Sequence, residues 1–96
     1  MNAPMISVII PLYNKEDSIL ETVDSVFNQS FKDFELLIID DGSTDRSLAL
    51  LGKIQDKRLR IVSKPNGGVS DARNYGAKLA KADFIFYLDA DDLLLN

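Results

Sequence analysis

Four short apolar runs alternate with three stretches of helical spacing, and this alternation constrains the fold more than any other feature of the sequence. The runs are rich in β-branched and aromatic residues and lie at 6–10, 34–39, 59–62 and 84–88. Nearly continuous apolar character is typical of parallel strands that are buried on both faces. The order βαβαβαβ, joined by right-handed crossovers, predicts an α/β fold: an open, mostly parallel, Rossmann-like sheet with helices on both faces.

Three stretches between these runs have apolar or small residues at helical spacing: 15–29, 48–54 and 69–80. Asn14 is expected to cap the first helix, and Ser43 or Thr44 the second, because short polar side chains at these positions satisfy free amides of the first turn. The third helix is rich in Ala and Gly, which favours close packing on a sheet.

The sequence contains no cysteine and no histidine among its 96 residues, and this removes several classes of chemistry. There is no disulfide framework, no thiolate or imidazole metal site, and no catalytic triad that uses a histidine base. Any metal must therefore bind oxygen. The length suits a single domain over residues 1–96, small for an enzyme.

Charge and hydropathy set two further limits. The net charge is −4 and the basic residues are scattered, whereas a nucleic-acid binder normally has a basic face, so we expect no nucleic-acid partner. No apolar run approaches the roughly 20 residues of a membrane span, and the opening residues lack the basic region of a signal peptide. We expect a cytoplasmic protein.

The unusual polar residues gather in the loops that follow the four runs. In parallel sheets, the loops at the carboxyl ends of the strands meet at one edge and form the ligand crevice. The loops concerned are 11–15, 40–45, 63–68 and 89–92. The sequence therefore predicts a ligand site at this edge.

Three acids, Asp89, Asp91 and Asp92, directly follow the last apolar run. Carboxylates packed this closely repel one another unless a cation or a proton relieves them. Mg²⁺ or Mn²⁺ fits best, because these ions accept oxygen ligands and take the remaining ones from water or phosphate. The alternative is an acidic turn that only caps the next segment.

Two more acids, Asp40 and Asp41, follow the second run. One of them is enough for turn and cap chemistry, so we expect the other, Asp41, to lack a basic partner and to accept hydrogen bonds from a nucleobase imide or a ribose hydroxyl. Tyr13 either completes the core or offers its ring to a base.

Lys64 and Arg73 bring positive charge to this acidic edge, and a Gly pair between them lets backbone approach a ligand at a helix N-terminus. Together with a metal, they suggest a diphosphate. The alternative for Arg73 is a salt bridge to Asp71 or to an acid of the edge.

Four motifs occur together at fixed spacing, in the stretches SVIIPLYNKEDSILETVDSVFNQSFKDFELLIIDDGSTDRS and NGGVSDARNYGAKLAKADFIFYLDADD. In this respect the chain, from Ile6 to Asp92, resembles the amino-terminal half of the family 2 glycosyltransferases, inverting enzymes of the GT-A fold. The resemblance implies a nucleotide-sugar donor, most often a UDP-sugar, a saccharide or lipid-linked acceptor, and Mn²⁺ or Mg²⁺ as cofactor.

The resemblance also implies roles for individual residues. Tyr13 would flank the uracil, with Pro11 at the backbone turn beneath it and Asp41 accepting from the uracil imide. Arg73 would face the ribose and diphosphate. The same motifs imply that Asp40 and Lys64 contact the nucleotide-sugar. Asp89 and Asp91 would be the two acids of the metal-binding DxD motif, with Asp89 near the ribose and Asp91 as the direct metal ligand.

The second half of the family pattern does not match this chain. That half supplies the acceptor site and the general base, and neither Asp92 nor another residue here corresponds to the base. We therefore expect residues 1–96 to be a donor-binding fragment that binds without turnover, in which a free sheet edge and Leu93, Leu94 and Leu95 promote self-association. For the complete enzyme, peripheral association with the inner membrane face is left open.

Two other functions compete with this interpretation. The first is a receiver-like signalling module in which clustered acids bind Mg²⁺ and one is phosphorylated, although no fifth strand carries the lysine that it needs. The second is a non-catalytic assembly domain that dimerises through its leucines. Phosphorylation by a small phosphodonor, or association without a nucleotide effect, would distinguish them.

Overall fold

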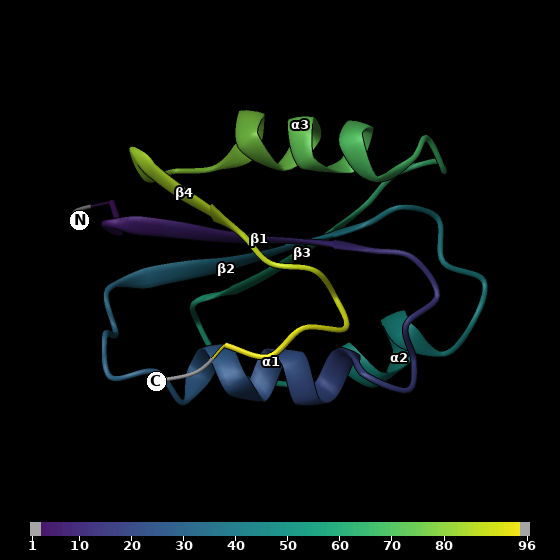
Figure 1. The fold of residues 1–96 in the computed structure, drawn as a ribbon, viewed down its shortest axis with the longest axis horizontal. Coiled ribbons are helices and arrows are strands. Elements are labelled where there is room, and N and C mark those ends of the chain that lie inside the picture. Colours follow the sequence, from purple (N-terminus) through teal and green to yellow (C-terminus); the bar gives the residue numbers. More distant parts are fainter. Residues whose placement is uncertain (1–2, 95–96) are drawn as a thin grey trace.

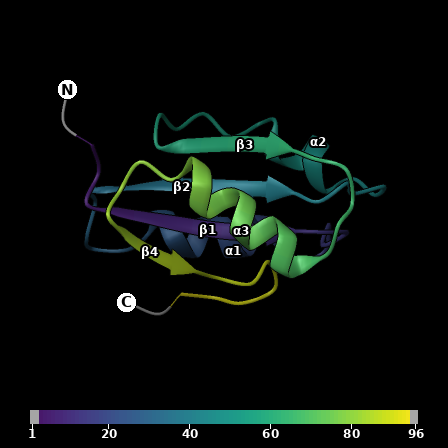
Figure 2. The same cartoon turned by 90° about the horizontal axis from the view of Figure 1, so that it is seen from above.

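The computed structural model describes residues 3–94 and has the predicted element order (Figure 1). Its strands are β1 (Ile6–Leu12), β2 (Phe34–Asp40), β3 (Leu59–Ser63) and β4 (Phe84–Tyr87). Its helices are α1 (Ile19–Phe27), α2 (Ser47–Leu51) and α3 (Val69–Leu79). The strand order is β3-β2-β1-β4, and each pair of neighbours is parallel, as Figure 2 shows from above. The predicted α/β fold is confirmed.

The helices form layers on both faces of the sheet. α3 lies over one face, and α1 and α2 lie under the other (Figure 1). Alternate residues of the central strands divide between two cores, since successive side chains of a strand point to opposite faces. Ile10 and Ile38 belong to the core beneath α1, whereas Ile9 and Ile39 belong to the core beneath α3.

The expectation that all four strands are buried on both faces holds only for β1 and β2. Every residue of β4 is exposed, with Phe84 at 68%, and β3 is half-buried. β4 pairs with β1 along one edge, and within residues 3–94 no strand pairs with its other edge. Strand order determines this exposure, and the apolar pattern within a strand does not reveal it.

The predicted helix caps are wrong. α1 begins at Ile19, well after Asn14, and Asn14 adopts a left-handed conformation with φ 51°. Its Oδ1 atom accepts hydrogen bonds from the amides of Thr44 (2.7 Å) and Asp45 (3.2 Å), so it links two loops instead of capping a helix. At the start of α2, the amide of Ser47 donates to Asp45 Oδ1 at 2.9 Å. Asp45 therefore accepts the hydrogen bond that we expected Ser43 or Thr44 to accept.

Gly76 allows α3 to pack closely on the sheet, as the small residues of this segment predict. A Cβ atom at Gly76 would lie 2.7 Å from Ile9 Cγ2 and 3.1 Å from Ile39 Cγ1.

A buried carboxylate, Glu35, holds the end of α3 against the sheet. The apolar pattern of the sequence does not indicate this role, because Glu35 lies within an apolar run. Glu35 accepts hydrogen bonds from Ser7 Oγ (2.6 Å) and the amide of Lys81 (2.7 Å).

The segment after β4 turns back along α1, beneath the sheet (Figure 1). Leu94 is partly buried and packs against the core beneath α1, which corrects the expectation that its side chain is free to promote self-association. Leu93 is 52% exposed, as expected. Leu95 lies outside the described residues. Within residues 3–94, no helix is both long enough and apolar enough to cross a membrane.

Candidate functional site

The four loops predicted to form a ligand edge do meet at the carboxyl ends of the strands, around a cavity of about 450 Å³. Its walls come from all four loops and from the first turn of α3. The lining residues are Pro11, Leu12, Tyr13, Lys15, Asp41, Asn66, Gly68, Val69, Ala72, Asp89, Ala90 and Asp91. Five of the predicted site residues are therefore brought together: Pro11, Tyr13, Asp41, Asp89 and Asp91.

Tyr13 lines the cavity and is 46% exposed, so its ring does not complete the core. The loop that carries it is held against the next loop, because the amide of Asn14 donates to Ser43 Oγ at 3.0 Å and the amide of Lys15 donates to Ser47 Oγ at 3.0 Å. Pro11 is buried at the end of β1. The ring of Tyr13 is thus available to a ligand from a fixed loop.

Asp40 and Asp41 have different surroundings. Asp40 does not line the cavity: its carboxylate accepts from the amide of Ser43 and from Ser63 Oγ, both at 3.2 Å, which ties together the loops after β2 and β3. Asp41 lines the cavity and is 2% exposed. Of this pair, Asp41 is therefore the acid that faces the cavity.

Asp41 has a basic partner, contrary to expectation. Lys64 Nζ donates to Asp41 Oδ1 at 2.9 Å and also contacts Asp71, and only 9% of the Lys64 side chain is exposed. The amides of Gly67 and Gly68 each donate to the Asp41 carboxylate at 2.9 Å. Lys64 thus lies behind the cavity wall, and the Gly-pair amides bind Asp41 within the chain.

These donors set the ionisation of the pair. Burial alone would raise the pKa of Asp41, but hydrogen bonds from Lys64 and from the amides of Gly67 and Gly68 outweigh it and lower the pKa below its ordinary value. Hydrogen bonds to Asp71 and Asp41 raise the pKa of Lys64. Asp41 is therefore a carboxylate, and Lys64 an ammonium, at neutral pH.

The loop at 66–68 bends at Gly68, which has φ 101° and stands directly before α3. A Cβ atom there would meet nothing within 4 Å, so the backbone conformation, and not space, favours glycine. This bend aims two consecutive amides at Asp41 and places the start of α3 against the cavity.

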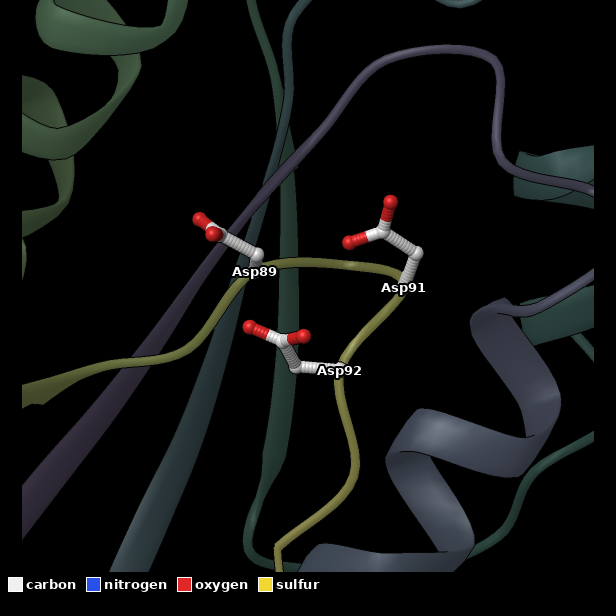
Figure 3. Close-up of side chains that lie close together, drawn as sticks. All are labelled: Asp89, Asp91 and Asp92. Carbon is white, nitrogen blue, oxygen red and sulfur yellow. The ribbon is translucent and has the colours of Figure 1, made fainter.

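The acids after β4 project from one turn, as Figure 3 shows. Asp89, Asp91 and Asp92 are exposed, and each offers a carboxylate oxygen within 4.8 Å of the others. Three oxygen donors at this spacing, on the rim of a cavity, fit Mg²⁺ or Mn²⁺, which complete their coordination with water or phosphate oxygens. The donor set does not favour zinc or copper, which prefer nitrogen or sulfur ligands.

Two cations already approach this turn. Arg73 Nη2 lies 3.1 Å from Asp89 Oδ1, and Lys15 Nζ lies 3.5 Å from Asp91 Oδ2. The salt bridge of Arg73 to an acid of the edge, one of the two alternatives for this residue, is therefore present. Because all four side chains are at least 39% exposed, these pairs contribute little stability and can exchange partners.

Sequence reasoning missed Lys15 and Asn66 as cavity residues. Lys15 stands where the expected ligand loop 11–15 meets the expected helix 15–29, and in the structure it lies in the loop before α1. Asn66 Nδ2 donates to the backbone oxygen of Asp41 at 2.9 Å and, more weakly, to Asp41 Oδ2 at 3.3 Å. An Asn before a Gly pair at a ligand edge is the signal that could have identified it.

Comparison with known proteins gives the same fold and the same family. The chain is 43% identical over 99 residues to an uncharacterised glycosyltransferase of Haemophilus influenzae. The match covers all of this chain and 40% of that protein. The chain superposes on residues 1–349 of Staphylococcus aureus TarS, in complex with UDP-GlcNAc, with a TM-score of 0.86 and 36% identity, covering 93% of this chain and 27% of that TarS chain. It also superposes on the mannosyltransferase PcManGT of Pyrobaculum calidifontis, in complex with GDP-Man and Mn²⁺, with a TM-score of 0.88 and 25% identity. All of this chain and 30% of PcManGT are covered.

The matched region includes the cavity and the acids on its rim. It spans well under half of each of the matched chains. The model of the family described as glycosyl transferase family 2 matches residues 7–96, nearly the whole chain. The chain belongs to glycosyltransferase family 2.

Proposed function

We propose that this chain is the donor-binding part of a glycosyltransferase, with a nucleotide-sugar, most readily a UDP-sugar, in the cavity. The observation that carries the proposal is the convergence of Tyr13, Asp41 and the Asp89–Asp92 turn on one cavity of about 450 Å³. A nucleobase requires an aromatic face to stack on, and its ring N–H requires a hydrogen-bond acceptor, here a buried one. A diphosphate with its metal requires a cluster of oxygen ligands.

Tyr13 and Asp41 would recognise the base. The exposed ring of Tyr13 offers a stacking surface. Both oxygens of Asp41 already accept hydrogen bonds, but the contact from Asn66 is long, at 3.3 Å, and Asn66 Nδ2 has a better acceptor in the backbone oxygen of Asp41 at 2.9 Å. A uracil imide can therefore replace this one contact at small cost, while Lys64 and the glycine amides keep Asp41 ionised and in place.

The diphosphate would lie between the acidic turn and the start of α3. Asp91 and Asp89 would hold Mn²⁺ or Mg²⁺, with Asp89 also near the ribose. When bound, such an ion reduces the negative charge that develops on the departing nucleoside diphosphate. Arg73 and Lys15, released from their exposed salt bridges, would face the ribose and phosphates from the same rim. Lys64 would act only through Asp41, because Asp41 and Asp71 already surround its ammonium group.

Transfer to the hydroxyl of a saccharide or lipid-linked acceptor, with inversion, would require more than residues 1–96. We propose that these residues form one donor-binding domain, and that the acceptor site and the general base belong to the rest of a longer protein. The chain spans 40% of its Haemophilus influenzae relative, which is consistent with this division. That TarS was determined with UDP-GlcNAc, and PcManGT with GDP-Man and Mn²⁺, supports a nucleotide-sugar and a divalent ion.

Calorimetric titration with UDP, in the presence and absence of Mn²⁺, tests this proposal. We expect tighter binding and a larger thermal stabilisation with Mn²⁺, because the diphosphate supplies ligands that the acids lack. Uridine is the matched control, since it has the base but no phosphates, and its binding should not depend on the metal. Equal affinity for UDP with and without Mn²⁺ would refute the metal bridge, and failure to bind UDP under either condition would refute the function.

We also propose that isolated copies of this chain associate through the outer edge of β4. Within residues 3–94 no strand pairs with that edge, and Phe84 (68%) and Phe86 (45%) are exposed beside it. An unpaired strand edge is a template for pairing with a second copy. Sedimentation at increasing concentration should show dimers or larger species, and Phe84→Lys should reduce them.

A further inference from the structure

The acidic turn is fastened to α1 through the carbonyl of its central residue, Ala90. Ser18 Oγ and Thr22 Oγ1 both donate to Ala90 O, each at 3.0 Å. Thr22 is fully buried and Ala90 is 3% exposed, so water does not compete for this carbonyl. A carbonyl oxygen has two lone pairs, and these two hydroxyls satisfy both.

The same face of α1 holds the next residues of the segment. Ser25 Oγ accepts a hydrogen bond from the amide of Leu94 at 3.0 Å, and Gln29 Nε2 donates to Leu94 O at 3.1 Å. Ser18, Thr22, Ser25 and Gln29 are spaced by four, three and four residues, so they form a polar stripe along one side of α1 and its flanks. Figure 1 shows the segment after β4 running along this helix.

The acidic turn needs such an anchor. Its three carboxylates offer oxygens within 4.8 Å of one another and repel, which favours an opened turn. The pairs with Arg73 and Lys15 are exposed and therefore weak restraints. Within the turn, the amide of Asp92 donates to Asp89 O at 3.0 Å. The two buried bonds to Ala90 thus fix the middle of this turn to α1, while the bond from the amide of Leu88 to Ile9 O, at 3.0 Å, fixes the residue before the turn to β1.

We propose that Thr22 and Ser18 are positioning residues for divalent-metal binding: by fixing Ala90, they hold Asp89 and Asp91 at the spacing that a metal ion needs. The inference rests on the proposed function, since it assumes that these acids bind a metal. The residues of α1 do not line the cavity. According to this inference, α1 nevertheless controls how tightly the site binds a metal ion. If the hydroxyls only stabilised the fold, their removal would change thermal stability and leave metal affinity unchanged.

The experiment compares Thr22→Val, which keeps the shape of the side chain and removes the hydroxyl, with Thr22→Ser, which restores it. Ser18→Ala with Thr22→Val leaves Ala90 without either donor. Ser25→Ala is the matched control, because it removes a hydroxyl bond of the same stripe that reaches Leu94 and not Ala90. For each protein, the dissociation constant of Mn²⁺ is measured by electron paramagnetic resonance at saturating UDP, and metal-free UDP binding is measured by calorimetry.

We expect Thr22→Val to weaken Mn²⁺ binding about 10-fold, at the lower end of the effect of residues that orient metal ligands. The double variant should weaken it further, Thr22→Ser should be close to wild type, and Ser25→Ala and all metal-free UDP affinities should be unchanged. Unchanged Mn²⁺ affinity in folded Thr22→Val would overturn the inference, as would an equal loss in Ser25→Ala. If the wild-type chain with UDP bound no Mn²⁺, the proposed metal site itself would fail, which separates the two outcomes.

Discussion

Asp41 and Lys64, at the ends of neighbouring strands, form a nearly buried ion pair with 2.9 Å between Oδ1 and Nζ. Lys64 also contacts Asp71 near the start of α3, and the amides of Gly67 and Gly68 complete the carboxylate's partners. The pair therefore joins β2, the following loop and α3, and it fixes the one cavity acid that is buried. Asp41 and Lys64 were both expected to contact the ligand. In the structure only Asp41 lines the cavity, and Lys64 holds the Asp41 carboxylate in place.

The first prediction concerns acid stability. Because the pKa of Asp41 is lower in the folded chain than its ordinary value, the unfolded chain binds the proton first as the pH falls. The stabilisation by Asp41 is complete above about pH 4 and is lost as the pH falls through its lowered folded pKa. Thermal unfolding at neutral pH should show Asp41→Asn less stable by about 1.5 to 3 kcal/mol, the range for hydrogen bonds to a charged group.

The difference between wild type and Asp41→Asn should then narrow below about pH 4. The pKa values of Asp45 and Asp56 are also lowered, so both proteins lose stability in acid for other reasons, and the comparison of the two isolates Asp41. A difference that stays constant from pH 7 to pH 2.5 would contradict the assigned ionisation.

The second prediction concerns Tyr13. Its ring is exposed at the cavity and contributes nothing to the cores, so Tyr13→Ala should leave the melting temperature unchanged. It should weaken UDP binding by about 1 to 3 kcal/mol, the range for loss of a ring stacked on a base. Calorimetry on Tyr13→Phe, which keeps the ring, and Tyr75→Ala, which removes an exposed ring elsewhere, provides the controls. Full UDP affinity in Tyr13→Ala would argue against stacking.

The third prediction separates Asp40 from its neighbour. Asp40→Ala removes the acceptor for the amide of Ser43 and for Ser63 Oγ, so the chain should lose about 1 to 3 kcal/mol of stability. Its UDP affinity, measured well below the melting temperature, should remain that of the wild type, because Asp40 does not line the cavity. Asp40→Asn can keep both contacts and is the matched control. A loss of affinity without a loss of stability would instead place Asp40 on the ligand.

The fourth prediction concerns the packing of α3. Gly76→Ala places a methyl group 2.7 Å from Ile9 Cγ2, and such overpacking costs roughly 1 to 3 kcal/mol against about 1 kcal/mol gained in helix propensity. We expect a net loss of up to about 2 kcal/mol in chemical denaturation. Gly52→Ala, where the nearest atom is a backbone oxygen at 3.4 Å, should change stability far less. Equal effects at the two positions would mean that α3 can move off the sheet.

Local patterns in the sequence were enough to predict the strands and helices, because the period of the apolar residues changes at each element. They also predicted which loops meet, since parallel connectivity places all carboxyl ends at one edge. Tyr13, Asp41 and the acidic turn were found in this way.

The remainder depends on contacts between distant residues. Asn14 lies 30 positions from Thr44, and Asp41 lies 23 positions from Lys64, so neither partnership has a signature in the nearby sequence. The exposure of β4 follows from strand order, and the contacts of the polar stripe of α1 with Ala90 and Leu94 join residues that are 65 to 72 positions apart. Each of these required the tertiary fold.

The last prediction is that the 96-residue chain binds UDP and Mn²⁺ but transfers no sugar. General-base catalysis typically contributes about 100- to 10,000-fold, and a candidate base must reach the acceptor hydroxyl. Of the acids on or beside this cavity, Asp41 and Asp71 are paired with Lys64, and Asp89 and Asp91 are the proposed metal ligands. That leaves Asp92, which is exposed on the same turn. Incubation with a panel of UDP-sugars and saccharide acceptors should give no product in either the wild type or Asp92→Asn. Transfer by the wild type that Asp92→Asn abolishes would identify Asp92 as the base and show that the division between donor and acceptor parts is wrong.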